Sequence, residues 1–273
     1  MVELNVLVAD LRAESAEIDA LVGGLSADDW ATPTPAAGWT VAHQVAHLAW
    51  TDRQALLAIN DEAAFRAELA AITVPPERMD ELVDAAAAEG AAQPPAELLA
   101  GWRRGRDDLA EILERAPDDT KLPWYGPPMS AASMVTARLM ETWAHGYDIA
   151  DALGVLREPT ARLRHVAHIA VRTRDFAYLV RGEQPPAEQF RVELTGPDGE
   201  VWTWGPADAD QRVTGPALDL CLLATQRINR ADTALVTAGP DADAWLDIAQ
   251  AFAGPPGDGR DAGSRERERR TPA

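Results

Sequence analysis

A carboxylate and an imidazole stand one helical turn apart at Glu141 and His145. Residues at positions i and i+4 lie on one face of a helix, so these two side chains can grip one ion. His43 and His47 repeat this spacing in an earlier segment. They form a two-ligand grip of their own, or either one supplies a third ligand to the first pair. Two histidines and one carboxylate leave a coordination position open for water or substrate, as in catalytic zinc sites.

A cation bound there would lower the pKa of water or of a thiol and would polarise a carbonyl group. The competing interpretation is that Glu141 and His145 are ordinary polar residues of a bundle helix, because Glu-x3-His is common by chance. His43 and His47 lie on a flank outside the apolar stripe of their helix, which weakens the interpretation of both as packed core residues. That stripe contains Val41, Val45, Leu48, Leu56 and Ile59.

Helices must position these side chains, and apolar residues at helical spacing predict four long ones. Thr40 and Ser130 are suitable N-caps for the two helices that carry the candidate ligands. Residues 61–93 predict one or two short helices, and two proline-rich loops separate the remaining segments. This pattern indicates a four-helix bundle. The long helices are expected over residues 2–25, 41–59, 95–115 and 131–153.

After Gly154 the pattern changes, and strands join the helices. The Asp198-Gly199 pair is a strong hairpin signal between two predicted strands. The expected fold class is α + α/β, a helical bundle followed by a smaller mixed domain. We expect a bundle over 1–156, a linking helix with an α/β domain over 157–253, and a disordered tail over 254–273. The expected elements are helices 159–181, 216–228 and 241–252, and strands 189–194, 200–204 and 233–237.

The chain of 273 residues carries a formal net charge of −19, which argues against electrostatic capture of nucleic acid or anionic lipid. No apolar segment is long enough to span a bilayer, and the N-terminus lacks the basic start of a signal peptide. The single cysteine, Cys221, excludes an internal disulfide framework and lies in an apolar run, which predicts a buried, inert thiol. We expect a cytoplasmic protein.

Two motifs carry a resemblance to a known family. Thr40–Ala49 (TVAHQVAHLA) together with Glu141–Asp148 (ETWAHGYD) resembles the DinB/YfiT-like metal-binding bundles, in particular the N-terminal domain of the mycothiol-dependent maleylpyruvate isomerases. In that family a histidine late in the second-helix motif and the Glu-x3-His of the fourth helix bind a divalent metal, usually assigned as zinc. The resemblance therefore implies His47, Glu141 and His145 as the metal ligands. It leaves His43 as a spare residue near the pocket.

The resemblance continues beyond the bundle. Residues 190–199, 213–219 and 222–227 look like the smaller C-terminal α/β domain of the same isomerases. There an arginine after the apolar helix segment helps to form the active site, and Arg227 stands at the matching position. Without the resemblance, Arg227 is better interpreted as part of an interdomain salt bridge. Residues 124–130 through 250–256 look like an actinobacterial branch of these proteins, to which the isomerase reaction is not simply transferred.

Several further polar and aromatic residues adjoin the candidate ligands in sequence. Asp148 is expected either to orient a ligand imidazole or to pair with an arginine such as Arg138. Asp52 is expected to belong to an ion pair. Trp39 and Trp143 flank the ligand segments and are candidates for the wall of a pocket.

Together these features predict a metal-dependent and thiol-dependent (mycothiol-type) transferase or isomerase that acts on a small organic substrate, with Arg227 orienting that substrate. The alternatives are a hydrolase that uses metal-bound water and a non-catalytic metal or small-molecule binding protein. Zinc is the expected ion, although the ligand set also accommodates nickel, manganese and iron. The expected partners are the substrate and a low-molecular-weight thiol, with no nucleic acid and no membrane. The sequence does not decide between a monomer and a homodimer.

Overall fold

The computed structural model describes residues 3–117, 120–257 and 259–264 of the chain. These residues form two compact units. The first unit ends at Leu156 and also takes in Ala253–Pro255. The second unit covers Arg157–Phe252 and continues from Pro256.

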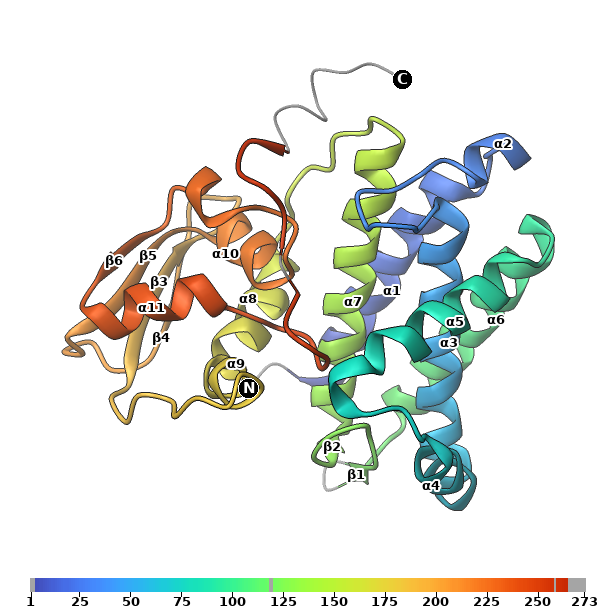
Figure 1. Ribbon diagram of the computed structural model, residues 1–273, viewed down its shortest axis with the longest axis horizontal. Coiled ribbons are helices and arrows are strands. Elements are labelled where there is room, and N and C mark those ends of the chain that lie inside the picture. Colours follow the sequence, from blue (N-terminus) through green and yellow to red (C-terminus); the bar gives the residue numbers. More distant parts are fainter. Residues whose placement is uncertain (1–2, 118–119, 258, 265–273) are drawn as a thin grey trace. The chain divides into compact units, whose positions relative to one another are not determined.

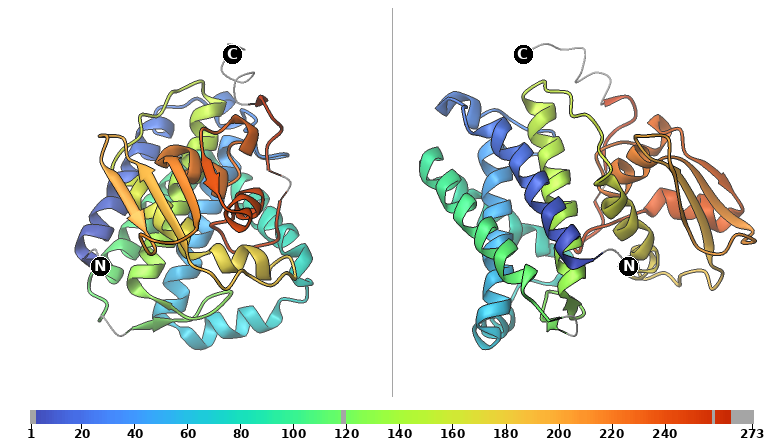
Figure 2. Two further views of the ribbon diagram at one scale, coloured as in Figure 1. Left: turned by 90° about the vertical axis from the view of Figure 1, so that its left-hand side faces the viewer. Right: turned by 180° about the vertical axis from the view of Figure 1, so that it is seen from behind.

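The first unit is helical, and its long helices run side by side (Figures 1 and 2). Helices α6 and α7 each pack against both α1 and α3. The long helices predicted from apolar spacing are confirmed, with ends that differ by at most three residues, as at Val22 against the expected residue 25. Their bounds are α1 Leu4–Val22, α3 Val41–Asn60, α6 Pro95–Glu114 and α7 Ala131–Ala152.

Shorter elements connect the long helices. The expected short helices between residues 61 and 93 are present, and the loop before α7 contains a pair of two-residue strands that the sequence analysis did not predict. A strand of two residues is too short to show an alternating pattern. These elements are α2 Ala27–Trp30, α4 Glu62–Ala71, a 3-10 turn Pro76–Arg78, α5 Met79–Ala91, β1 Lys121–Leu122 and β2 Met129–Ser130.

The core of this unit holds α3 in place on both sides of His47. Val45 and Leu48 are fully buried, and they pack in one cluster with Ile18 of α1, Trp102 of α6 and Ile149 of α7. Burial of each such side chain is worth roughly 1.5–3 kcal/mol. Because residues 45 and 48 bracket residue 47, this packing fixes the direction in which the His47 side chain leaves the helix.

Helix α5 approaches α3 unusually closely at Gly90. A Cβ atom added at Gly90 would lie 2.7 Å from the Cβ of Ala46. Any side chain at Gly90 would therefore push α5 away from the segment of α3 that carries the candidate ligand. Glycine is needed at position 90 because there is no space for a side chain between α5 and α3.

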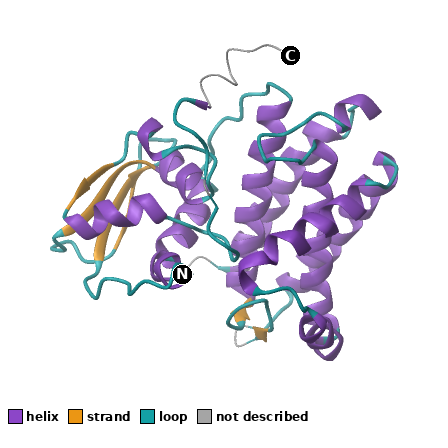
Figure 3. Ribbon diagram, viewed as in Figure 1, coloured by secondary structure: helices purple, strands orange, loops and turns teal. Residues whose placement is uncertain are grey.

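The second unit combines a small mixed sheet with helices (Figure 3). Within its described residues the strand order is β4-β3-β5-β6, with β3 parallel to β5 and the other two pairs antiparallel. Burial alternates along β3, and α10 and α11 both pack against β5. The elements are α8 Leu163–Arg172, α9 Arg174–Leu179, β3 Phe190–Thr195, β4 Val201–Trp204, β5 Gln211–Pro216, α10 Ala217–Ala224, a 3-10 turn Arg230–Asp232, β6 Val236–Ala238 and α11 Pro240–Ile248.

The expected fold class, a helical domain followed by a smaller α/β domain, is confirmed, but several predicted elements of the second unit were wrong. One helix over 159–181 is in fact α8 and α9, which meet at Thr173. The Thr173 hydroxyl donates to the carbonyl groups of Ile169 at 2.9 Å and Gln250 at 2.7 Å, and such side-chain bonds compete with helical ones. Strand β5 was missed, because its parallel partner β3 lies across a hairpin and a loop in the sequence.

Helix ends in the second unit also differ from the prediction. Helix α10 stops at Ala224 and α11 at Ile248, each four residues before its expected end, at 228 and 252. Of the expected tail over 254–273, residues 254–257 and 259–264 are described, and residues 258 and 265–273 lie outside the described part. Two hydrogen bonds reach the described part, from Asn229 Nδ2 to the Arg260 carbonyl and from the Gly263 amide to Asp232, both at 2.7 Å. Among the described helices, none has the length and apolar character needed to cross a membrane.

Candidate metal centre

Helices α3 and α7 bring three of the predicted site residues together in the helical unit. His47 of α3 lies with its Nε2 atom 3.8 Å from Glu141 Oε2 of α7. The ring centroids of His47 and His145 are 4.5 Å apart. His47 is buried, whereas the Glu141 side chain keeps 24% of its surface exposed. Two imidazoles and one carboxylate therefore adjoin, and the carboxylate is partly exposed to solvent.

Trp39, in the loop before α3, covers this group of side chains. Its ring stacks on His145 with a centroid distance of 5.9 Å and an interplanar angle of 17°. It also lies 5.4 Å from the ring of His47. The indole Nε1 donates to Asp84 of α5 at 2.8 Å, which fixes the orientation of the ring. Trp39 thus packs against the rings of two candidate ligands.

His43 has a structural role at the start of α3. Its Nδ1 atom accepts from the backbone N–H of Thr40 at 3.3 Å and lies 2.8 Å from the Thr40 hydroxyl. This is the reciprocal arrangement of a capping box, with histidine in place of the usual glutamate. No ion pair joins His43 to Glu141 among the described residues. The structure therefore brings His47, and not His43, beside the carboxylate.

Arg138 binds the carboxylate of Glu141 from within the protein. Its Nη1 donates to Glu141 Oε2, and its Nε donates to Asp52 Oδ1 at 3.0 Å. The Arg138 side chain is 1% exposed, and burial raises the pKa of Asp52 more strongly than Arg138 lowers it. The expected ion pair of Asp52 is confirmed. Arg138 links α3 to the candidate ligand, a role that the sequence analysis did not assign to it.

Gln44 connects His145 to the loop that carries Trp39. The Gln44 side chain is fully buried, and its Oε1 atom lies 2.5 Å from His145 Nδ1. Its Nε2 donates to the hydroxyl of Thr34 at 2.9 Å. The Thr34 hydroxyl in turn donates to the Trp39 carbonyl at 3.0 Å. A signal for Gln44 existed in the sequence, because polar residues recur at 44, 47 and 51 with the spacing of a buried helix face.

The donor set matches the chemistry of a divalent ion, although the side chains as they stand do not enclose one. Among the described residues, no group of three or more His, Cys, Asp or Glu side chains has the geometry to hold a metal ion. Ligand atoms at about 2.0–2.1 Å from a tetrahedral zinc ion lie about 3.4 Å apart. The His47–Glu141 separation of 3.8 Å exceeds that value by a few tenths of an ångström. For His47 and Glu141, this one distance is therefore close to the spacing of two ligands of the same ion.

Two other predicted residues, Trp143 and Asp148, are buried in the helical unit, and Arg227 belongs to the second unit. Trp143 is buried with its ring 4.6 Å from that of Tyr147. Asp148 is also buried, and the ion pairs of Arg138 run to Asp52 and Glu141. Arg227 belongs to the second unit, where its Nη1 donates to the Thr225 carbonyl.

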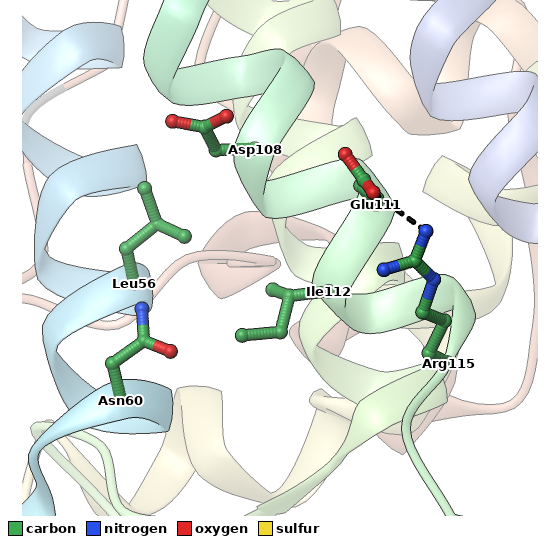
Figure 4. Close-up of a pocket in the computed structure, with 6 residues that line it drawn as sticks. All are labelled: Leu56, Asn60, Asp108, Glu111, Ile112 and Arg115. Atoms are coloured by element: carbon green, nitrogen blue, oxygen red, sulfur yellow. Dashed lines mark hydrogen bonds and ion pairs between the residues drawn. The ribbon is translucent and has the colours of Figure 1, made fainter.

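A surface hollow of about 320 Å³ lies elsewhere on the helical unit (Figure 4). It is formed by the ends of α3 and α6, and an ion pair between Arg115 and Glu111 borders it at 2.6 Å. None of the candidate ligands lines this hollow. The candidate centre is therefore defined by its side-chain geometry.

Comparison with known proteins places this geometry in a family. The model of the mycothiol maleylpyruvate isomerase N-terminal domain family matches residues 11–150, which is about half of the chain and includes all three candidate ligands. The chain belongs to the mycothiol maleylpyruvate isomerase N-terminal domain family. A second model, described as wyosine base formation, matches residues 186–237.

Two similar proteins and two crystal structures align with most of this chain. The uncharacterized proteins MT0041 and Rv0036c of Mycobacterium tuberculosis are each 59% identical over 260 residues, covering 95% of this chain and all of theirs. Crystal structures of the mycothiol-dependent maleylpyruvate isomerase and of a mutant of it match with a TM-score of 0.57 at 16% identity. Each match covers 88% of this chain and 96% of the other. At this identity the structural likeness establishes the shared fold.

Proposed function

We propose that the protein binds one divalent metal ion through His47, Glu141 and His145 and uses it in a thiol-dependent transferase or isomerase reaction on a small organic substrate. The observation that carries this proposal is the convergence of these side chains from two helices. His47 lies 3.8 Å from the Glu141 carboxylate and its ring 4.5 Å from the ring of His145. Zinc is the proposed ion, because two imidazoles and a carboxylate are its common catalytic ligands.

The residues around the centre have separable tasks. When bound, the divalent ion would lower the pKa of a thiol and polarise a carbonyl group. His47, Glu141 and His145 hold it, and Arg138 keeps the Glu141 carboxylate in one orientation. Trp39 shields one side of His145 from water, which strengthens electrostatic interactions at the site.

A thiol nucleophile has to come from outside the chain. Cys221 is the single cysteine, and it is fully buried in the second unit, where its Sγ atom donates to the Leu163 carbonyl at 3.5 Å. Burial raises the pKa of this thiol far above its ordinary value, so it does not form a thiolate near neutral pH. A low-molecular-weight thiol fills this gap. Mycothiol is our choice because the matched isomerase is mycothiol-dependent.

Arg227 remains our candidate for orienting a carboxylated substrate, because a planar guanidinium binds a carboxylate through two parallel hydrogen bonds. This role is a proposal from the resemblance of its segment to the C-terminal domain of the isomerases. The cytoplasm remains the proposed location, since mycothiol is a reduced thiol and the chain has no disulfide framework.

The first test is metal content, measured by elemental mass spectrometry on tag-free protein after reconstitution with zinc. We expect about one equivalent in the wild type and less than about a tenth of that in His47→Ala and in Glu141→Ala. His43→Ala is the matched control, because it removes a histidine one turn away that caps the helix. It should retain the metal while losing about 1 kcal/mol of stability. Full stoichiometry in His47→Ala would refute the ligand assignment.

The second test is activity of the loaded protein with maleylpyruvate and related small acids, with and without mycothiol. Turnover that requires the thiol supports the proposal. Turnover without any thiol would instead assign a hydrolase that uses metal-bound water. A loaded protein that turns over nothing in a broad thiol and substrate screen would be a binding protein.

A further inference from the structure

We infer that Gln44 is a positioning residue that fixes the tautomer of His145 so that the lone pair of the ring is on Nε2. The inference rests on the proposed function, because the tautomer matters to the protein only if Nε2 is a metal ligand. Three side-chain hydrogen bonds in series link the Trp39 carbonyl to His145. In this series, the hydrogen bond before each group determines whether that group donates or accepts in the next one.

The series of hydrogen bonds begins at the Trp39 carbonyl, which can only accept. The Trp39 carbonyl accepts the backbone N–H of Thr34 at 2.8 Å and also the Thr34 hydroxyl at 3.0 Å. A threonine hydroxyl has one proton, and here that proton is committed to the carbonyl. The Thr34 oxygen must therefore accept from its next neighbour, Gln44.

That requirement sets the orientation of the amide of Gln44. Its NH2 group has to face the Thr34 hydroxyl, where the distance is 2.9 Å. Its Oε1 atom then faces His145 Nδ1 at 2.5 Å. An amide oxygen only accepts, so Nδ1 must carry the proton. In a neutral imidazole the lone pair is then on Nε2, which is the form that can ligate a metal.

The surroundings make this orientation hard to change. Gln44 is fully buried, so water does not replace either of its partners, and an amide turned the other way would face Thr34 with a second acceptor. Trp39 stacks on the ring of His145 and supplies the carbonyl at which the series begins. One loop therefore holds both the plane and the protonation of the candidate ligand.

Donation of the second ring N–H to an acceptor is the usual arrangement for a histidine that binds a metal. The acceptor orients the ring and raises the basicity of the ligating nitrogen. Loss of such a partner typically weakens metal binding by about 10- to 100-fold. Gln44→Leu removes the acceptor at nearly constant volume, so we expect a loss in that range.

The decisive experiment measures the tautomer directly, in metal-free protein with 15N-labelled histidine, by long-range proton–nitrogen NMR near pH 8. We expect His145 to carry its proton on Nδ1 in the wild type and to shift toward the Nε2–H form in Gln44→Leu. Competition titration with zinc gives the second readout. Gln54→Leu is the matched control, since Gln54 is a buried glutamine of the same helix that bonds Glu68 at 3.3 Å. It should leave both readouts unchanged.

Thr34→Val provides a second variant if Gln44→Leu does not fold. It removes the hydroxyl that orients the amide, so it should reduce zinc affinity less than Gln44→Leu does, and Thr34→Ser should restore it. An Nε2–H tautomer of His145 in the wild type would overturn the inference. So would a Gln44→Leu variant that matches the wild type in both tautomer and zinc affinity. A wild type without metal would refute the proposed function, while the NMR result would still decide the role of Gln44.

Discussion

Two seams of the first unit, the α3–α7 and α1–α6 packing interfaces, contain clusters of arginine and carboxylate side chains that differ in composition and burial. Between α3 and α7, Arg138 forms ion pairs with two carboxylates, those of Asp52 and Glu141. Between α1 and α6, Arg103 and Arg106 both bind the carboxylate of Asp19, and Arg106 Nε also lies 3.6 Å from Asp107 Oδ1. The first cluster therefore has more carboxylates than arginines, whereas the second has two of each.

The two clusters differ more in the burial of their side chains than in their composition. The side chains of Arg138 and Asp52 are 1% and 7% exposed, whereas those of Arg103 and Asp19 are 45% and 18% exposed. Burial raises the pKa of Asp52 despite its arginine neighbour. The hydrogen bond from Arg103, with support from Arg106, lowers the pKa of Asp19. The same pair of residue types thus has opposite effects, because desolvation dominates in one seam and not in the other.

The two clusters also differ in what their charges require. A partly exposed arginine–aspartate cluster adds modest stability and needs no further partner. A buried cluster with an extra negative charge carries a desolvation cost, and a divalent cation beside Glu141 would compensate that charge. Perturbed ionisable groups of this kind concentrate at functional sites.

The largest expected effect follows from removal of Arg138. Arg138→Met keeps the apolar stem but leaves the buried Asp52 carboxylate without its guanidinium, so we expect a loss of about 3–5 kcal/mol in the free energy of unfolding. Urea denaturation of metal-free protein measures it. The double variant Arg138→Met/Asp52→Asn should recover part of the loss, because the unpaired buried charge is gone. A loss below about 1 kcal/mol in Arg138→Met would contradict the contrast between the seams.

A sharper test compares the pH dependence of stability in Asp52→Asn and Asp19→Asn. The lowered pKa of Asp19 means that its contribution is present above its ordinary pKa of 3.8 and is lost as pH falls through the folded value. The raised pKa of Asp52 means that its contribution is full below 3.8 and is lost as pH rises toward the folded value.

The difference between wild type and variant should therefore increase with pH for Asp19→Asn and decrease with pH for Asp52→Asn. Urea unfolding in the presence of a chelator, at intervals between about pH 3 and 7, measures both slopes. Slopes of the same sign would show that the two carboxylates have similar environments.

The smallest effect is expected in the exposed seam at neutral pH. Asp19→Asn should reduce the free energy of unfolding by about 1 kcal/mol at low salt. Because exposed charges are screened by salt, this reduction should shrink by at least about half in 1 M NaCl. Metal content should not change. A salt-independent loss would indicate that Asp19 acts through packing or through uncharged hydrogen bonds.

In the helical unit, the local sequence pattern was sufficient to predict the bounds of the long helices. The bounds of α3 and α7 follow from apolar spacing and from Thr40 and Ser130 at their starts, because those signals lie within a few residues of the helix ends. The second unit was harder to predict. Strand β5 is defined by pairing with β3 about twenty residues away, and Thr173 interrupts a helix through a bond to the distant Gln250 carbonyl.

The candidate site likewise has one part that the sequence predicts and another that only the tertiary structure shows. Residue types and the i, i+4 spacing determined by themselves that Glu141 and His145 share a helix face and that a histidine of α3 could join them. Only the tertiary structure distinguished His43, which caps its own helix, from His47, which lies beside Glu141. It alone paired Asp52 with Arg138 and Gln44 with His145, residues 86 and 101 positions apart. Helix periodicity is local, whereas the partner of a buried polar group is set by whichever distant helix packs against it.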